Sequence, residues 1–432
     1  MTVGPATARP TELLSLEHAL AKMLDGLAPL ESEEVALDAA LGRVLAAPLR
    51  SLVTAPPFDN SAMDGYAVRA VDVAAAAPQQ PLSLPVIDES AAGRPASENV
   101  VAGTAIRILT GAPLPGGADA VVPLEDTDAH QRDGAAALET IAVLQPARPG
   151  AHVRRAGSDL RAGEPLLAAG AVLTPAALAV AAAGGHARLA VQRRPRVAVL
   201  ATGNELVAPG EPLGEAEIYD SNTVGLLGQA RRMGAEARSL GIAGDAVESV
   251  VSLLAPALDW ADVAVVSGGV SVGVHDVVKD AFARLGRIEL WRVAVQPGKP
   301  LAFGRAARPA GVREPLLFGL PGNPVSSLVT FELFVRPVLR RLAGHADPLA
   351  RDIVRARLAD DVSKAAGRRA FLRVRLSPAA DGGMMATLAG GQGSHVLSAL
   401  AAADGLAIVH EDVDGLPAGS EVEVIRLAGG DG

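Results

Sequence analysis

The chain has 432 residues, more than one ordinary hydrophobic core holds, and this length predicts roughly two to four domains. Acidic residues outnumber basic residues by 48 to 39, and the net charge of −9 disfavours a general binder of nucleic acids or anionic membranes. The absence of cysteine excludes disulfides, thiolate ligands and cysteine nucleophiles, so any metal must be bound through oxygen or histidine nitrogen, which favours hard cations such as Mg²⁺.

The first third of the chain predicts helices followed by an inserted β domain. Residues 1–14 contain no continuous apolar run and predict a flexible arm, not a signal peptide. Apolar residues at helical spacing predict an amphipathic helix in Leu13–Leu30, and a second helical stretch is predicted over Glu34–Ala46. From Leu49 to about Val143, short β-like runs separated by proline and glycine predict a small β domain, with Pro146–Gly150 as its exit linker.

Leu166–Gly185 lacks charged residues over roughly the length of a membrane span. Thr174 and Pro175 divide it, because threonine is a preferred N-cap and proline is favoured at the first helical position. We therefore expect a short strand, then a buried alanine-rich helix that ends at Gly184-Gly185, in a soluble cytoplasmic protein.

An α/β unit is predicted from Pro195 onwards. Ala246–Asp259 has apolar residues on one helical face, and Pro324–Ala343 is the predicted last helix of the unit. The predicted strands of the unit are Arg196–Leu200, Ser239–Ile242, Asp262–Val266, Leu301–Phe303 and Leu316–Leu320. Later β-like runs, which predict a small C-terminal β domain, are Ile353–Leu358, Phe371–Leu376 and Val422–Leu427. The predicted domains are 1–48 together with 147–190, 49–146, 191–345 and 346–432.

A glycine-rich segment, Ser267–Gly273 (SGGVSVG), follows a predicted buried strand and precedes a predicted helix. Glycines let a backbone approach a ligand closely, and the N–H groups of such a loop and of a helix N-terminus attract anions. A purely structural turn is the alternative, and this segment alone does not decide between them. The residues after the strand at 196–200 read ATGNEL, and those at 296–300 read QPGKP, so neither the dinucleotide nor the P-loop fingerprint is present. A dinucleotide oxidoreductase and a P-loop NTPase are therefore disfavoured.

Three acids, Glu205, Asp245 and Asp276, follow three separate apolar strands beside this loop. Together they could hold Mg²⁺ against a phosphate, although Asp276 alone is explained most simply as a helix cap. Lys299 and Arg292 could neutralise an anionic ligand or be solvated. Turn chemistry would equally explain the acids Asp59, Asp64 and Asp159, and backbone rigidity would explain LPGNP at 320–324. From the residues alone, the chain is an α/β protein that binds a phosphorylated small molecule with Mg²⁺, and its chemistry stays open.

Six segments, in order along the chain, resemble the molybdopterin molybdenumtransferase (MoeA) family, which also includes the gephyrin E-domain. They are PPFDNSAMDGYAVR (56–69), RILTGAPLPGGADAVVPLED (107–126), RRAGSDLRAGE (154–164), SGGVSVGVHDVVK (267–279), QPGKPLAFG (296–304) and FGLPGNPVSS (318–327). The resemblance implies a multidomain α/β plus β fold. Its expected parts are a three-layer α/β molybdopterin-binding domain, an inserted small β domain, an elongated helical linker domain and a C-terminal β-barrel.

The resemblance also implies a transferase of molybdenum cofactor biosynthesis. Molybdate is inserted into adenylylated molybdopterin, AMP is released and Mg²⁺ assists. A homodimer is implied, with the active site between the α/β domain of one subunit and the inserted domain of the other. Further implied partners are molybdopterin adenylyltransferase and proteins of molybdoenzyme maturation, with no nucleic acid and no membrane. Alternatives are a molybdopterin adenylyltransferase, a non-catalytic pterin-binding scaffold, or tungsten in place of molybdenum.

Site residues follow from matching positions. The implied catalytic residues are Asp276, Asp245, Glu205, Asp59, Thr110, Asp159 and Lys299, with Asp59 and Thr110 reached from the partner subunit. The implied metal ligands are Glu205, Asp245 and Asp276. The implied substrate-binding residues are Ser267, Gly268, Gly269, Ser271, Gly273, Asn222, Arg292, Pro321, Gly322, Asn323 and Pro324. Asn204 stands where many relatives have aspartate, so no acid role is expected at that position.

Overall fold

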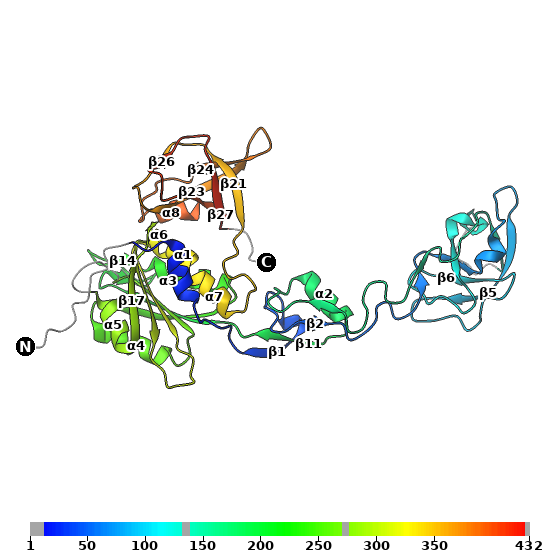
Figure 1. Ribbon diagram of the computed structural model, residues 1–432, viewed down its shortest axis with the longest axis horizontal. Helices are drawn as coiled ribbons and strands as arrows, with labels where there is room; N and C mark the ends of the chain where they lie inside the picture. The colour runs from blue at the N-terminus through cyan, green and yellow to red at the C-terminus, as the bar shows by residue number, and fades with distance from the viewer. Residues whose placement is uncertain (1–12, 132–138, 270–275, 428–432) are drawn as a thin grey trace, which may run out of the picture.

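The computed structural model describes residues 13–131, 139–269 and 276–427. The molecule is elongated: the α/β domain and the C-terminal barrel lie at one end, the inserted domain lies at the other, and a narrow linker region joins them (Figure 1). In these three ranges, no helix has the length and apolar character needed to cross a membrane.

The α/β domain is built on a six-stranded mixed sheet with the order β15-β12-β16-β20-β19-β17. The parallel strands are β12 (Arg196–Thr202), β15 (Glu236–Ala243), β16 (Val263–Ser267) and β20 (Leu316–Leu320). The antiparallel strands are β19 (Pro300–Ala306) and β17 (Gly286–Arg292). All five strands predicted for this unit are confirmed, whereas β17 was not predicted. A short parallel ladder is formed by β13 (Leu206–Val207) and β14 (Ile218–Tyr219).

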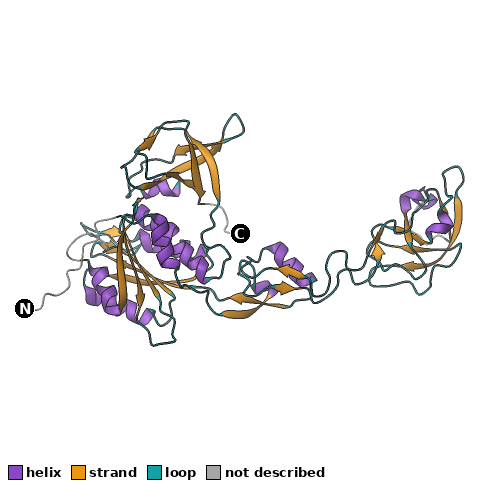
Figure 2. Cartoon of the chain, in the orientation of Figure 1, coloured by secondary structure: helices purple, strands orange, loops and turns teal. Residues whose placement is uncertain are grey.

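Helices cover both faces of this sheet (Figure 2). One face packs against α4 (Val247–Ala257) and α5 (Val277–Leu285). The other face packs against α3 (Ser221–Arg232), α6 (Pro324–Thr330) and α7 (Arg336–Leu342). The predicted single helix Pro324–Ala343 is α6 and α7 joined by the π-helical segment Phe331–Val335. The sheet therefore lies between two helical layers, with its strand ends free for loops.

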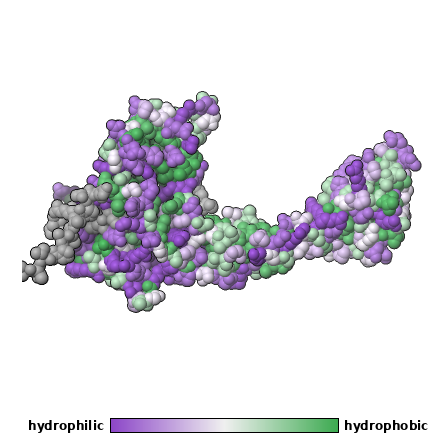
Figure 3. Space-filling model, in the orientation of Figure 1, coloured by the Kyte–Doolittle hydropathy of each residue, from purple (hydrophilic) through white to green (hydrophobic). Residues whose placement is uncertain are grey.

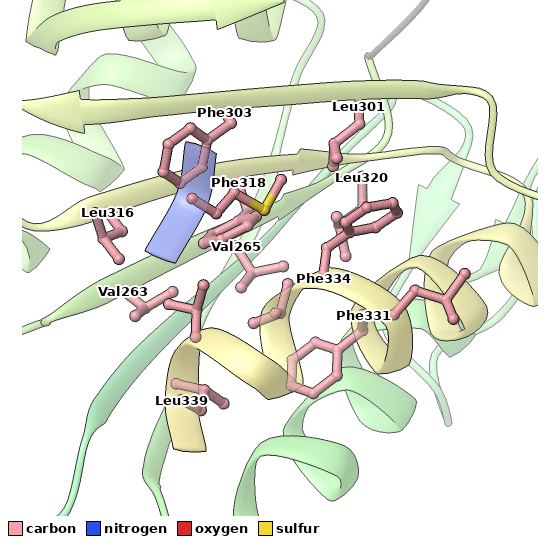
Figure 4. Close-up of a cluster of buried hydrophobic side chains, with 14 of the residues drawn as sticks. Val263, Val265, Leu301, Phe303, Leu316, Phe318, Leu320, Phe331, Phe334 and Leu339 are labelled. Atoms are coloured by element: carbon pink, nitrogen blue, oxygen red, sulfur yellow. The ribbon is translucent and has the colours of Figure 1, made fainter. Parts of the chain in front are cut away.

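Aromatic and aliphatic side chains fill the space between the sheet and α6–α7 (Figure 4). Phe303 and Phe318 meet edge to face with ring centroids 5.1 Å apart. Phe331 and Phe334 are completely buried on the π-helical segment. Since each fully buried phenylalanine contributes roughly 1.5–3 kcal/mol, this contact fixes the helical layer on the sheet.

The N-terminal part differs from the prediction. The helix α1 (Leu16–Leu24) is shorter than the predicted Leu13–Leu30, and it packs on the α/β domain rather than in the linker region to which residues 1–48 were assigned. The predicted helix Glu34–Ala46 is wrong, because this stretch contains the strand β1 (Ser32–Ala36) and a 3₁₀ turn, Leu37–Ala39. Antiparallel pairing of β1 with β11 (Arg188–Gln192) overrides the local helical propensity.

The linker region consists mainly of paired strands, so its prediction as a helical domain is wrong. Besides β1 and β11, the strand β2 (Leu49–Arg50) pairs with β10 (Pro165–Leu167). One helix, α2 (Pro175–Ala183), lies beside them. The predicted start and end of this helix are confirmed: the Thr174 hydroxyl accepts a hydrogen bond from the backbone N–H of Ala177 (3.2 Å), and Gly184 is the C-cap. The prediction that the helix is buried is wrong, because only Ala177 and Ala181 of its residues are buried.

The inserted domain contains a five-stranded sheet with the order β7-β4-β6-β5-β8. Its strands are β4 (Gly65–Val68), β5 (Leu82–Ser90), β6 (Ala105–Ile108), β7 (Ala120–Pro123) and β8 (Thr140–Val143). The neck of the domain is a small ladder of β3 (Asn60–Ser61) and β9 (Val153–Arg154). Its 3₁₀ turns are Ala70–Val73, Leu124–Asp126 and Asp128–Gln131.

The C-terminal domain is a closed five-stranded barrel, as the family resemblance implied. Its strand order is β23-β24-β21-β27-β25, and the pairing of β23 with β25 closes the ring. The strands are β21 (Ile353–Leu358), β23 (Arg369–Pro378), β24 (Met384–Leu388), β25 (Gly405–Val409) and β27 (Glu421–Arg426). Smaller elements are β22 (Val362–Ser363), β26 (Gly415–Leu416) and α8 (Leu397–Ala401).

The barrel is attached firmly to the α/β domain. A strand of the α/β domain, β18 (Val295–Gln296), pairs in parallel with β23. Buried Glu332 accepts a hydrogen bond from Nη1 of Arg351 (2.6 Å), which lies in the segment that leads into the barrel. Arg232 donates a hydrogen bond to the carbonyl of Leu427, directly after the last strand of the barrel. These contacts bring a barrel loop next to the strand ends of the α/β sheet.

Candidate functional site

Three loops meet at the carboxyl edge of the α/β sheet. The strands β12, β16 and β20 are neighbours, and their register places Ala201 beside Ser267 and Ser267 beside Leu320. The backbone N–H of Gly268 donates to the carbonyl of Leu320 at 3.2 Å, which joins the second loop to the third. This edge is where open α/β sheets bind ligands.

Asn222 ties the N-terminus of α3 to two of these loops. Its Nδ2 donates to Ser267 Oγ and to the carbonyl of Gly322, both at 2.7 Å. Ser267 is only 2% exposed, and its Oγ also lies 3.3 Å from Ser327 Oγ. The structure therefore brings together three of the predicted substrate-binding residues, Asn222, Ser267 and Gly322.

The glycine-rich loop begins with two residues that only glycine suits. Gly268 has φ of 98° and Gly269 has φ of 66°. A Cβ atom on Gly268 would lie 2.4 Å from the backbone oxygen of Thr202. The close backbone approach expected of an anion-binding loop is thus present at its start. Ser271 and Gly273, also predicted as binding residues, lie outside the described residues.

The three predicted acids have different environments. Asp276 is 4% exposed and caps α5, with its Oδ1 accepting the backbone N–H of Lys279 at 2.9 Å, which confirms the helix-cap interpretation. Glu205 and Asp245 are exposed at the ends of β12 and β15. Asn204 and Asp245 join these two ends through reciprocal hydrogen bonds of 3.2 Å between backbone N–H groups and side-chain oxygens.

These acids do not form a ready metal cage. Over the ranges that the structure describes, no three histidine, cysteine or acidic residues lie close enough to hold a metal ion together. The predicted set Glu205, Asp245 and Asp276 is therefore not assembled by the protein alone. The exposed carboxylates at the strand ends would leave a hard cation to be completed by other oxygen ligands.

The QPGKP loop lies at the same edge, because β19 starts there and runs antiparallel to β20. Gly298 has φ of 108°, and a Cβ there would lie 2.3 Å from Thr330 Oγ1. Lys299 is half-buried and Arg292 is exposed, and neither forms an ion pair with a described residue. Both cations are thus free of described acidic partners, as a role in neutralising an anion requires.

The sequence did not indicate two barrel residues beside the site. Asn323 Nδ2 donates to Ser394 Oγ at 2.9 Å, and the backbone N–H of Val325 donates to the Ser394 carbonyl at 3.1 Å. Arg373 is 1% exposed and donates to the carbonyls of Gly391 and Gly393, which holds this loop, and burial lowers the pKa of its guanidinium. The charges in FLRVRL (371–376) were the available signal, but nothing in the sequence pointed to their partners.

The remaining predicted residues lie in or beside the inserted domain. Asp59 accepts hydrogen bonds from the backbone N–H of Ala156 (2.8 Å) and from Arg155 Nη1 (2.6 Å). Thr110 donates hydrogen bonds to Asp64 from its backbone N–H and from its hydroxyl. Asp159 is exposed, and its backbone N–H donates to the carbonyl of Ala55. Within one chain, the linker region separates the inserted domain from the α/β loops (Figure 1).

The carboxyl groups of the inserted domain predict a pH dependence of its stability. Hydrogen bonds from Ala156 and Arg155 hold the pKa of Asp59 below 3.8, and those from Thr110 do the same for the pKa of Asp64. Backbone N–H groups of Glu98 and Glu89 and the Ser97 hydroxyl lower the pKa of Asp88 to about 2. Because these folded-state values are depressed, the stabilisation is complete above about pH 4 and is lost as the pH falls towards about 2.

We therefore expect the urea midpoint of the inserted-domain transition, followed by circular dichroism, to be constant from about pH 7 to 5 and to fall between about pH 4 and 2. An Asp88→Asn variant should show a shallower fall. A urea midpoint that rises on acidification would contradict the lowered pKa values of these carboxyl groups.

Models of three protein regions match the chain in order. The MoeA N-terminal region (domain I and II) matches residues 14–185, a probable molybdopterin binding domain matches 198–341, and the MoeA C-terminal region (domain IV) matches 355–427. Together they span the linker region, the inserted domain, the α/β domain and the barrel.

Individual relatives are similar over nearly their whole length. The chain is 41% identical to molybdopterin molybdenumtransferase 2 of Mycobacterium tuberculosis over 417 residues, 95% of this chain and 98% of the relative. It is 36% identical to the molybdopterin molybdenumtransferase of Haemophilus influenzae over 415 residues, again 95% and 98%. A crystal structure of the molybdopterin biosynthesis moeA protein from Pyrococcus horikoshii OT3 matches with a TM-score of 0.81 at 30% identity, covering 96% of this chain and all of that one.

Proposed function

The chain belongs to the MoeA family of molybdopterin molybdenumtransferases, and from this premise we propose that it inserts molybdate into adenylylated molybdopterin with release of AMP. It is a transferase of molybdenum cofactor biosynthesis. The observation that carries the finer proposal is the loop arrangement at the carboxyl edge of the α/β sheet. There an anion-binding backbone, two cations without described acidic partners and exposed carboxylates converge.

This arrangement suits a reaction between anions. Molybdate and the substrate phosphates repel each other, so a site that joins them needs positive charge and N–H donors. In the proposal, the backbone at Ser267–Gly269 and the N-terminus of α5 bind the pterin phosphate. Lys299 and Arg292 offset the charge of molybdate or phosphate, and Pro321–Pro324 with Asn222 border the bound substrate.

Assistance by Mg²⁺ is part of the proposal, supported by the position of Glu205 and Asp245 beside the expected phosphates. The described acids supply no three-ligand group. A bound Mg²⁺ would therefore complete its octahedral coordination with substrate oxygens and water, as Mg²⁺ commonly does beside phosphates. Glu205 and Asp245 would each contribute at most a carboxylate arm.

We further propose a homodimer whose active site joins the α/β domain of one subunit to the inserted domain of the other. Two features support it. The linker region separates the inserted domain, to which Thr110 belongs and which Asp59 adjoins, from the α/β domain that holds Glu205 and Asp245 (Figure 1). The linker region and the neck expose large apolar side chains, Leu41, Leu52, Val53 and Phe58, and hydrophobic colour gathers over the linker region in Figure 3.

A molybdopterin adenylyltransferase is the alternative function within the same pathway. Similarity to the relatives covers the inserted domain and the barrel as well as the α/β domain, which favours the molybdenumtransferase. A pterin-binding scaffold without catalysis, and tungsten in place of molybdenum, are further outcomes that an assay separates. We propose that the reaction takes place in the cytoplasm.

The test uses purified protein with adenylylated molybdopterin, Mg²⁺ and either molybdate or tungstate. We expect molybdate-dependent AMP release and a product that activates an apo-molybdoenzyme. Synthesis of adenylylated pterin from ATP would support the adenylyltransferase instead. Pterin binding without turnover would support the scaffold, and tungstate-dependent AMP release that exceeds the molybdate rate would reassign the metal.

A further inference from the structure

We propose that Asp64 is a positioning residue that fixes the hydroxyl of Thr110 as a hydrogen-bond acceptor for an N–H group of the substrate. This inference rests on the proposed function, in which the inserted domain of one subunit completes the active site of the other, and on the site role that the family resemblance implies for Thr110. Asp64 itself was explained from the sequence only by turn chemistry, and it was not among the predicted site residues.

The register of two neighbouring strands places the two residues together. Gly65, at the start of β4, lies opposite Ile108 at the end of β6. Asp64 therefore stands beside the segment that continues to Thr110. One carboxylate oxygen, Oδ1, accepts both the backbone N–H of Thr110 at 2.6 Å and its hydroxyl at 2.7 Å. Two donors from one residue on one oxygen restrict the rotation of the threonine side chain.

This geometry sets the polarity of the Thr110 hydroxyl. A carboxylate without a proton only accepts hydrogen bonds, so the hydroxyl must direct its single proton towards Asp64. The hydrogen bonds from Thr110 also keep the pKa of Asp64 below 3.8, which leaves this carboxylate ionised near neutral pH. What the Thr110 oxygen offers a ligand is then its lone pairs. These suit an N–H donor, such as those on the pyrimidinone ring of a pterin, and not a phosphate oxygen.

The backbone around the pair is held in place before any substrate arrives. The N–H of Gly111 donates to the carbonyl of Ser61 (2.8 Å), and the N–H of Ser61 donates to Ala112 (3.1 Å). The N–H of Leu114 donates to the carbonyl of Asp59 (2.9 Å), so the loop that contains Asp59 and the loop that contains Thr110 form one unit. Such a supporting shell is what a positioned contact requires, because a loosely held hydroxyl loses orientation.

A double-mutant cycle tests the coupling in the full-length protein. We expect Asp64→Ala and Thr110→Val each to lower kcat/KM for adenylylated molybdopterin about tenfold. The double variant should be no worse than about tenfold, instead of the roughly hundredfold loss expected for independent sites. Asp64→Asn keeps an oxygen acceptor for the hydroxyl and should retain activity within about threefold, and Thr110→Ser should do the same. Thermal midpoints of all variants separate unfolding from loss of positioning.

The matched control is Asp88→Ala in the same domain. Asp88 also accepts backbone and hydroxyl hydrogen bonds from a turn, from Ser97 N (2.7 Å), Ser97 Oγ (2.9 Å) and Glu98 N (3.0 Å), but it was not assigned to the site. We expect this variant to keep kcat/KM. An additive double variant, or a Thr110→Val variant as active as wild type, would overturn the positioning role while wild-type AMP release still stands. Absence of AMP release in the wild type would instead overturn the proposed function.

Discussion

Replacement of Gly268 by alanine should lower molybdate-dependent AMP release at least about 100-fold, because two separate constraints at this position exclude a side chain. The φ of 98° is a conformation that residues with a Cβ rarely adopt. The added Cβ would also lie 2.4 Å from the backbone oxygen of Thr202. Since that oxygen belongs to the end of a central strand, the loop must move instead, and the substrate phosphate loses its N–H donors.

A matched variant in the same domain provides the control. A Cβ on Gly228, in the helix α3, would meet nothing within 4 Å, and Gly228 is not among the predicted site residues, so Gly228→Ala should keep activity within a few-fold. AMP release, and the inhibition of substrate binding by added phosphate, should be measured for each variant together with its thermal midpoint. A Gly268→Ala variant as active as Gly228→Ala would contradict a binding role for the start of the loop that begins at Ser267.

Local patterns predicted those parts of the fold that depend on nearby residues. The buried strands β12, β16 and β20 are short apolar runs that end in turn residues, and such runs need a central position in a sheet. The helix α2 was predicted from its cap, Thr174, and from Pro175. In each case the residues that determine the element lie within a few positions of one another in the sequence.

Strand pairings between distant segments could not be predicted from local sequence patterns. The stretch at Ser32–Ala36 resembles a helix locally, yet it becomes a strand because Arg188–Gln192 pairs with it from far along the chain. The strand β17 escaped prediction because its polar, arginine-bearing sequence suits an edge strand and shows no continuous apolar run. The helical run Pro324–Ala343 could be predicted from the sequence. Its π-helical segment could not, because this segment depends on how Phe331 and Phe334 pack on the sheet.

The candidate site divides in the same way. The loops after β12, β16 and β20 could be grouped in advance, since parallel strands end at one edge. Ser394 could not, because it reaches Asn323 only after the barrel has docked on the α/β domain. Asp64 was visible in a turn, but its hydrogen bonds to Thr110 depend on the pairing of β4 with β6. Residue types thus indicated the chemistry, while long-range pairing selected the supporting residues.

Asp276 has a structural role as the N-cap of α5, and this role must be separated from any role of its carboxylate in the reaction. Loss of the N-cap in Asp276→Ala should destabilise the α/β domain by about 1 kcal/mol, because the N–H of Lys279 loses its acceptor. If the carboxylate also acts on the substrate, AMP release should fall at least about 100-fold. The alanine variant alone cannot distinguish these effects, since it removes the cap and the charge together.

Asp276→Asn separates them, because asparagine is as good an N-cap as aspartate but carries no charge. We expect this variant to unfold within about a degree or two of the wild type and still to lose at least about 100-fold of its AMP release. The matched control is Asp220→Asn at α3, where Asp220 is also buried and accepts the backbone N–H of Thr223 at 3.0 Å. Activity that survives in both asparagine variants would reduce Asp276 to a helix cap. Activity lost only at 276 requires its negative charge at the carboxyl edge of the sheet, beside the loop that begins at Ser267.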